Sequence, residues 1–282
     1  MVDEEALLQQ AETLLDLRRH DEAIKTIAML MAAAPEEEYY HFLMARAMLD
    51  KDDWVQAKAF CMSGLKQNPD HAYGFFLLSI SCHYLNEFDN ELKYAQESTR
   101  LMPDEAFTLD RLARAQIQSG MLSAAKDTAR QLVEVGPNSV EGHHLLADIT
   151  FDLDDYNTAE THYRAALRLE PDSLFLQNNL GRTLLASKQW REAIDTFFTS
   201  TKLDPTNETV RSNLHLSVEK WLGRSLTRAA RQQKLEMLPA PVQMFFADVE
   251  SRRNLWSRTW FQVVFWIAVT LGVTIVIQLG SG

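Results

Sequence analysis

The sequence predicts an all-α fold, a solenoid of about six helical hairpins followed by a capping helix and one C-terminal transmembrane helix. Three observations predict it: prolines that recur at a fixed interval, apolar residues at helical spacing between them, and a terminal segment of 21 residues without formal charge. Together they divide the 282 residues into a long repetitive part and a short apolar end.

The prolines define the repeat. Seven of the eight stand on a grid with a 34-residue interval. Because proline lacks a backbone donor and clashes with the preceding turn, each of them marks a boundary between helices. An Asp or Asn follows four of them, and we expect these side chains to accept hydrogen bonds from the free amides of the next helix. The grid is Pro35, Pro69, Pro103, Pro137, Pro171, Pro205 and Pro239, and the expected caps are Asp70, Asp104, Asn138 and Asp172.

Small side chains recur at two positions of each 34-residue unit, where they let two antiparallel helices approach closely. Each unit is therefore predicted to be a helical hairpin. A single hairpin cannot bury its apolar face alone, so neighbouring hairpins are expected to stack. Counted from residue 4, position 8 is Ala11, Ala45, Ser79, Ala113, Ala147 and Gly181, and position 20 is Ala23, Ala57, Glu91, Ala125, Ala159 and Ala193.

This pattern resembles the tetratricopeptide repeat (TPR) family, which shares the period, the small residues and the terminal proline. The resemblance covers residues 4–207 and implies a right-handed superhelix of six repeats: 4–37, 38–71, 72–105, 106–139, 140–173 and 174–207. Residues 208–236 depart from the pattern and are expected to form a capping helix or a degenerate seventh repeat. The best-matching residues are Leu146, Ala147, Tyr156, Ala159, Tyr163, Ala166 and Pro171, then Leu180, Gly181, Trp190, Ala193, Phe197 and Pro205.

The segment from Thr259 to Leu279 carries no formal charge and predicts a membrane span. As a helix it is about 31 Å long, close to the thickness of a bilayer core. Arg252, Arg253 and Arg258 precede it, and basic residues favour the cytoplasmic side. We therefore expect a tail-anchored chain with cytoplasmic repeats, in a bacterial inner membrane or a eukaryotic organelle membrane.

Residues 237–258 carry a second apolar stripe at helical spacing, formed by Val242, Phe245, Phe246, Val249 and Trp256. Two interpretations stay open. The stripe forms an amphipathic juxtamembrane helix on the membrane surface, or it packs on the last hairpin and closes the solenoid. Within the span, Ala268 and Gly272 form a small-xxx-small pair, which leaves homodimerisation open as well.

The TPR resemblance implies that the first helix of each hairpin lines a concave groove in which a protein or peptide partner binds. Aromatic rings there would bind apolar side chains, and arginines would bind carboxylates. The alternative is that many of these aromatic residues belong to the core between repeats. The implied groove residues are Tyr39, Phe42, Arg46, Tyr73, Phe76, His83, Tyr84, Phe107, Arg114, Phe151, Phe175, Asn178 and Arg182.

Other classes of function find little support in the sequence. The net charge of -11 argues against a nucleic-acid partner. No phosphate loop, HExxH pair or nucleophile elbow is present, so we expect no enzyme, no catalytic residues, no metal site and no cofactor. The predicted function is a membrane-anchored adaptor that binds a protein or peptide partner. The alternative is a scaffold that assembles with copies of itself.

Overall fold

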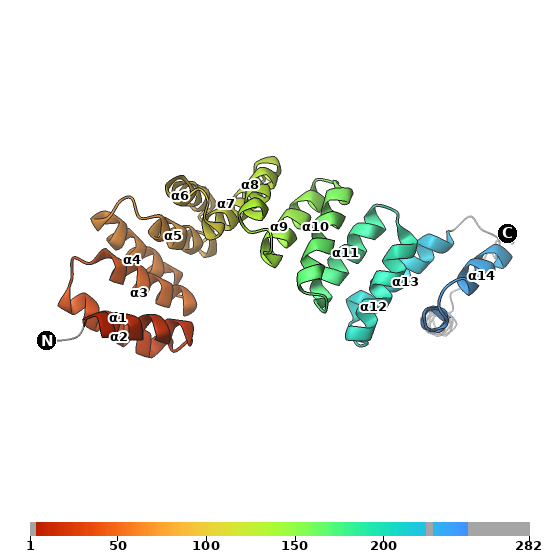
Figure 1. The fold of residues 1–282 in the computed structure, drawn as a ribbon, viewed down its shortest axis with the longest axis horizontal. Helices are drawn as coiled ribbons and strands as arrows, with labels where there is room; N and C mark the ends of the chain where they lie inside the picture. Colours follow the sequence, from red (N-terminus) through yellow and green to blue (C-terminus); the bar gives the residue numbers. More distant parts are fainter. Residues whose placement is uncertain (1–3, 224–227, 248–282) are drawn as a thin grey trace, which may run out of the picture. The chain divides into compact units, whose positions relative to one another are not determined.

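The computed structural model describes residues 4–223 and 228–247 and divides the chain into two compact units, Met1–Pro171 and Asp172–Gly282. In the described residues every regular element is an α-helix (Figure 1). The all-α prediction is therefore confirmed for this part of the chain.

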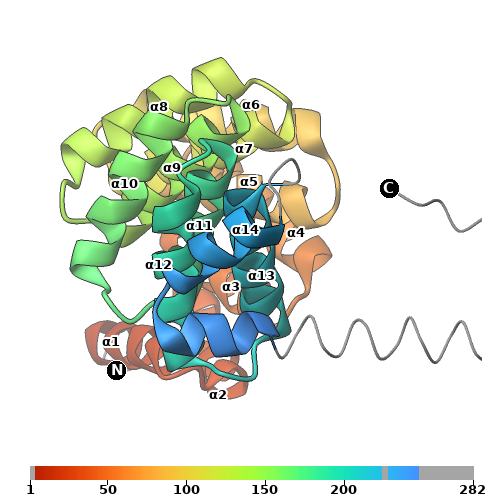
Figure 2. The same ribbon diagram turned by 90° about the vertical axis from the view of Figure 1, so that its right-hand side faces the viewer.

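The first unit consists of five antiparallel hairpins. In each, a helix of 13 residues is followed by one of 14, and consecutive helices contact one another. Figure 2 shows α6, α8 and α10 in an outer row and α5, α7 and α9 in an inner row. The helices are α1 (Glu4–Asp16), α2 (His20–Ala33), α3 (Glu38–Asp50), α4 (Trp54–Gln67), α5 (Ala72–Tyr84), α6 (Phe88–Leu101), α7 (Ala106–Gln118), α8 (Leu122–Val135), α9 (Val140–Asp152) and α10 (Tyr156–Leu169).

The turn inside each hairpin has the same geometry. One residue per turn adopts a positive φ, between 56° and 72°, and these residues are spaced by 34. Only the fourth turn uses glycine, and three others use Asp or Asn, which tolerate this conformation better than most residues. The series is Arg18, Asp52, Asn86, Gly120, Asp154 and Lys188, the last of them in the second unit.

The predicted N-caps are wrong by one residue. The first helices begin one position later than expected, so that His71, Glu105, Ser139 and Ser173 are the N-caps rather than the Asp or Asn after each proline. Ser139 and His71 accept a hydrogen bond from Gly142 N and Gly74 N, at 3.0 and 3.1 Å. In each of these connections the proline and the residue after it form the turn, so the helix begins one residue further on.

The small residues at positions 8 and 20 are buried where the helices of each hairpin cross, as predicted. Close contact is most evident where the residue is glycine. A Cβ atom added at Gly181, at position 8, would lie 2.6 Å from the ring of Phe197. Glu91, the exception at position 20, is as buried as the alanines it replaces.

The second unit contains α11 (Leu174–Ala186), α12 (Trp190–Leu203), α13 (Glu208–Leu222) and α14 (Arg228–Glu236), and residues 240–247 are helical. The segment 237–247 packs against this unit. Val242 and Phe246 are buried, the Phe246 ring stacks on His215 at 5.0 Å, and Arg211 lies 5.3 Å above the Phe245 ring. These contacts are with α13, which follows the last predicted hairpin, and they favour packing on the solenoid over a membrane-surface helix for this part of the stripe. Val249 and Trp256 lie outside the described residues.

No helix within residues 4–223 and 228–247 combines the length and the apolar character that a membrane span requires. The predicted span from Thr259 to Leu279, with its Ala268 and Gly272 pair, lies outside the described residues.

Candidate binding groove

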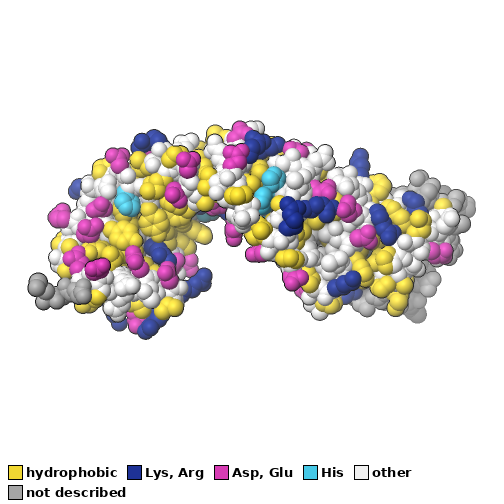
Figure 3. All heavy atoms as spheres, viewed as in Figure 1, with side chains coloured by type: hydrophobic (Ala, Val, Ile, Leu, Met, Phe, Trp, Pro, Cys, Tyr) yellow, Lys and Arg dark blue, Asp and Glu magenta, His cyan; other side chains and the backbone are white. Residues whose placement is uncertain are grey.

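The candidate groove is the surface that the inner helices of the first unit share. Helices α3, α5 and α7 contact one another in sequence, so residues on their common face form one continuous surface. Figure 3 shows hydrophobic side chains gathered over the region of α3 and α5. This is the face that the TPR resemblance implies for partner binding.

The centre of this surface is an aromatic cluster of Tyr73, Phe76 and Phe107. Ring centroids lie 5.8 Å apart for Tyr73 and Phe76, 5.0 Å for Phe76 and Phe107, and 6.3 Å for Tyr73 and Phe107. The last two pairs are edge-to-face, an arrangement that aromatic rings favour. All three side chains are only partly buried. The cluster therefore joins two repeats and still presents apolar surface to a ligand.

On the amino-terminal side of the cluster, α3 is tied to α1. The Tyr39 hydroxyl donates to Glu12 Oε1 at 2.9 Å, and an Arg46 guanidinium nitrogen donates to Asp16 Oδ1 at 2.7 Å. Burial and the hydrogen bond to Glu12 raise the pKa of Tyr39 to about 12. Arg46 was predicted to bind a ligand carboxylate, but here it already binds one from its own chain.

The tyrosines of α3 predict an alkaline transition. Burial, followed by a hydrogen bond to Glu4, also raises the pKa of Tyr40 to about 12. The unfolded value is about 10, so the stability that these phenols contribute is present below that pH and is lost as the pH rises through the folded value. We expect the urea midpoint of the first unit to fall between pH 10 and 12, and to fall less in the Tyr39→Phe, Tyr40→Phe variant. An equal decrease of the urea midpoint between pH 10 and 12 in the two proteins would contradict this prediction.

On the carboxyl-terminal side, Arg114 of α7 forms an ion pair within its own helix. Its Nε atom donates to Asp110 Oδ2 at 2.8 Å, and this hydrogen bond raises the pKa of the guanidinium. Asp148 and Glu141 of α9 also act on its charge. Both groove arginines of the first unit thus lie among carboxylates.

Phe42 corrects the predicted groove. Its side chain is fully buried, stacks on His71 at 4.3 Å and fills the space left by Gly64 and Gly74. It belongs to the core between the second and third hairpins. The ring occupies this position because neither glycine has a Cβ atom, and the resemblance to the family did not reveal that space.

The other predicted residues are distributed over several environments. Tyr84 stacks on Trp54 at 4.0 Å and leaves its other side exposed, and Phe151 lies edge-to-face against Tyr156. In the second unit, Phe175 is 58% exposed. Asn178 there accepts a hydrogen bond from Asn213 at 2.9 Å, and Arg182 donates to Asn179 at 3.3 Å.

His83 belongs to a buried polar network that the sequence analysis missed. Its Nδ1 atom lies 3.1 Å from both carboxylate oxygens of Glu91, which in turn pairs with Arg111 of the next repeat. The Arg111 Nε atom donates to Ser79 Oγ at 2.9 Å, and that hydroxyl donates to the backbone carbonyl of Glu91 at 3.1 Å. The signal for it was the replacement of a small residue by Glu91.

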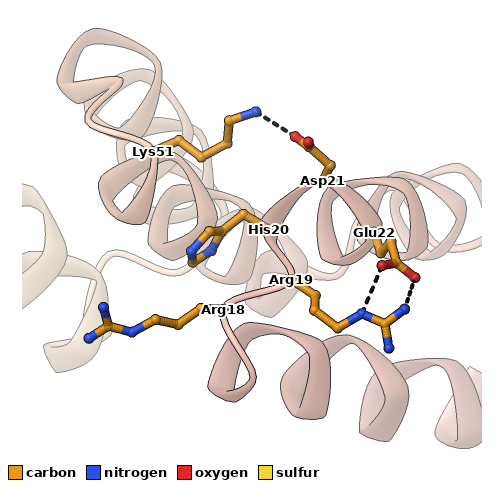
Figure 4. Close-up of a pocket in the computed structure, with 6 residues that line it drawn as sticks. All are labelled: Arg18, Arg19, His20, Asp21, Glu22 and Lys51. Atoms are coloured by element: carbon orange, nitrogen blue, oxygen red, sulfur yellow. Dashed lines mark hydrogen bonds and ion pairs between the residues drawn. The ribbon is translucent and has the colours of Figure 1, made fainter.

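A separate cavity of about 250 Å³ lies at the first hairpin turn (Figure 4). Two of its cationic side chains are engaged, because Lys51 pairs with Asp21 at 2.6 Å and Arg19 with Glu22 at 2.5 Å. In Figure 4 the Arg18 side chain points away from both pairs. The cavity is lined by polar and charged residues alone, namely Arg18, Arg19, His20, Asp21, Glu22 and Lys51.

The two cysteines and one pair of histidines are further candidate site residues within the described part of the chain. Burial raises the pKa of both Cys61 and Cys82, the latter to about 12, so the two free thiols are protonated at neutral pH. His143 and His162 are in contact through their Nδ1 atoms at 3.0 Å. In the part of the chain that the structure describes, no three His, Cys, Asp or Glu side chains form a group that could hold a metal ion.

Comparison with known proteins agrees with the fold. Residues 111–173 and 144–208 match the tetratricopeptide repeat model. Pseudomonas aeruginosa pilF is similar in structure, with a TM-score of 0.65, 13% identity and coverage of 74% of this chain and 95% of that one. YrrB, described as a TPR protein with an unusual peptide-binding site, has a TM-score of 0.57 and 12% identity and covers 65% of this chain and 95% of its own.

A sequence relative is a peroxisomal targeting signal receptor of Candida albicans, 25% identical over 172 residues. The matched region is 54% of this chain and only 27% of the receptor. The fold of this chain is that of a TPR solenoid, an all-α protein of stacked helical hairpins. The repeat model matches only residues 111–208, and the similar solved structures agree with it on the fold.

Proposed function

We propose that this chain is a non-catalytic adaptor that binds a protein or peptide partner in the groove of its first unit. The observation that carries the proposal is the partly exposed cluster of Tyr73, Phe76 and Phe107, because aromatic residues at the centre of a surface contribute most of the binding energy in many interfaces. Two comparisons support it: one relative is a targeting signal receptor, and one similar structure is described with a peptide-binding site.

Replacement of two cluster residues, Phe76→Ala together with Phe107→Ala, is expected to weaken binding of the partner by tenfold or more. Loss of two aromatic contacts of about 1 to 2 kcal/mol each accounts for this decrease. A photoreactive amino acid placed at Tyr73 first identifies the partner by crosslinking in cells, and fluorescence anisotropy then measures its affinity for each variant.

The matched control is Met62→Ala on α4, which removes an exposed apolar side chain from a second helix of a hairpin. It should bind the partner as the unchanged protein does. Circular dichroism establishes that the double variant remains folded. A folded double variant with unchanged affinity would exclude the groove as the binding site.

We also propose that the segment 259–279 anchors the chain in a membrane, with the repeats on the cytoplasmic side. The support is the absence of formal charge in this segment and the three arginines that precede it.

An Ile267→Arg substitution in the middle of the segment is expected to shift the protein from the alkali-resistant membrane fraction toward the soluble fraction, because a charge there costs about 2.5 to 3.5 kcal/mol. The conservative control Ile267→Leu should stay in the membrane fraction. If alkaline treatment released the unchanged protein from the membrane fraction, the proposed anchor would be wrong.

A further inference from the structure

The aromatic cluster of the groove lies between two groups of charged side chains. On one side, Asp16 and Asp50 flank the only guanidinium of α3, that of Arg46, and all three charges act on Tyr73 of the cluster. On the other side, Arg114 lies among Asp110, Asp148 and Glu141. In both groups carboxylates outnumber guanidiniums, so the surface on either side of the cluster is acidic.

The two arginines are not available to a ligand without a cost. Arg46 donates to Asp16 at 2.7 Å and Arg114 to Asp110 at 2.8 Å. Each guanidinium still has donors for a ligand carboxylate, but that carboxylate would lie beside the Asp16 or Asp110 carboxylate already bound there. Like charges about 4 Å apart repel by about 1 to 4 kcal/mol per pair near a protein surface. An acidic peptide is therefore opposed electrostatically.

A cationic ligand meets the opposite situation. The Asp16 side chain is 70% exposed, and its carboxylate has lone pairs enough for a second donor. On the other side, Asp148 already accepts from the Tyr163 hydroxyl and pairs with His144 at 2.9 Å, whereas Glu141 is exposed. Lysine or arginine side chains of a ligand could bind Asp16 and Glu141 without breaking the existing ion pairs. Electrostatic complementarity of this kind mainly sets specificity and the rate of association.

Provided that the groove is the binding site proposed above, we propose that its partner is an extended or helical segment in which large apolar side chains are flanked on both sides by lysine or arginine. The apolar side chains contact Tyr73, Phe76 and Phe107, and the basic ones face the acidic groups of α1 and α3 and of α7 and α9. This is the reverse of the carboxylate recognition that the arginines alone had suggested.

The first test is a selection of random twelve-residue peptides displayed on phage against the purified full chain. We expect enrichment of sequences with aromatic or aliphatic residues between basic ones and depletion of Asp and Glu. The most enriched peptide is then synthesised together with a version in which every Lys and Arg is replaced by Glu. The acidic version should bind at least tenfold more weakly, and raising the salt concentration should weaken only the basic one.

Two variants of the protein locate the effect. Asp50→Asn with Glu141→Gln removes one negative charge from each side of the cluster and should weaken the basic peptide several-fold. The matched control, Asp127→Asn, removes an exposed carboxylate from the second helix α8 and should leave the affinity unchanged. Equal affinities for all three proteins would overturn the inference.

The outcomes separate this inference from the proposed function. Enrichment of acidic peptides whose binding is lost in the Phe76→Ala, Phe107→Ala variant would overturn the inference and leave groove binding intact. If peptides of any charge bound that folded variant as well as the unchanged protein, the proposed function would be wrong. The photoreactive residue at position 73 would crosslink to residues 252–261 of the same chain if that segment, which carries arginines and tryptophans, occupied the groove. This result would overturn the inference that the ligand is a separate partner.

Discussion

Replacing Glu91 by alanine is expected to destabilise the first unit by about 3 to 5 kcal/mol, the cost of breaking a buried ion pair by removal of one partner. Alanine itself fits, because other repeats carry it at this position. The destabilisation arises from Arg111, whose side chain is 9% exposed and would lose its carboxylate partner. Urea denaturation followed by circular dichroism measures the change.

The companion variant Glu91→Ala, Arg111→Leu should recover most of that loss. The neighbouring repeats carry Leu77 and Leu145 at the position of Arg111, so the double variant restores the alanine and leucine that adjacent repeats have at these two positions. Buried ion pairs are often no more stable than apolar residues of similar volume. As an exposed reference, Glu22→Ala breaks the surface pair with Arg19 and should cost no more than about 1 kcal/mol. A double variant as unstable as Glu91→Ala would refute the ion-pair explanation.

Substitution of Phe42 by alanine is the second large effect that we expect, a loss of about 3 to 5 kcal/mol in the stability of the first unit. The ring fills the space beside Gly64 and Gly74, and its removal leaves a cavity between two hairpins. Thermal and urea denaturation both report this loss.

The control for Phe42 is another phenylalanine that was predicted to line the groove. Phe175→Ala removes a side chain that is 58% exposed and should change stability by less than about 0.5 kcal/mol. Gly74→Ala should also destabilise the protein, by about 1 to 3 kcal/mol, because its Cβ atom would lie 2.5 Å from the Phe42 ring. If Phe42→Ala left the protein as stable as Phe175→Ala does, the assignment of Phe42 to the core would be wrong.

The helices were predictable because their signals are local and repeated. Proline boundaries and small contact residues recur every 34 residues, so an error at one repeat is corrected by the others. The side-chain environments were less predictable because they depend on contacts with neighbouring repeats. Phe42 shares its position with groove residues of the family, and only the glycines at 64 and 74 distinguish it.

The ion pairs of the groove arginines were also only partly predictable from the sequence. The Arg114 and Asp110 pair has helical i, i+4 spacing and could have been recognised from the sequence. The Arg46 and Asp16 pair joins residues 30 positions apart and required the structure. For Val242 and Phe246, one apolar stripe suits a membrane surface and a protein surface equally, and only the packing against His215 distinguishes the two.

The buried pair between Glu91 and Arg111 has a consequence for the order of the repeats. Most units could be deleted or duplicated as whole 34-residue blocks, since the turns repeat with the same period. Deleting residues 106–139, however, would bring Leu145 to the position of Arg111 and bury the Glu91 carboxylate without a cation. We therefore expect a shortened or shuffled version of this solenoid that keeps Glu91 to fold best when it is cut outside residues 72–139.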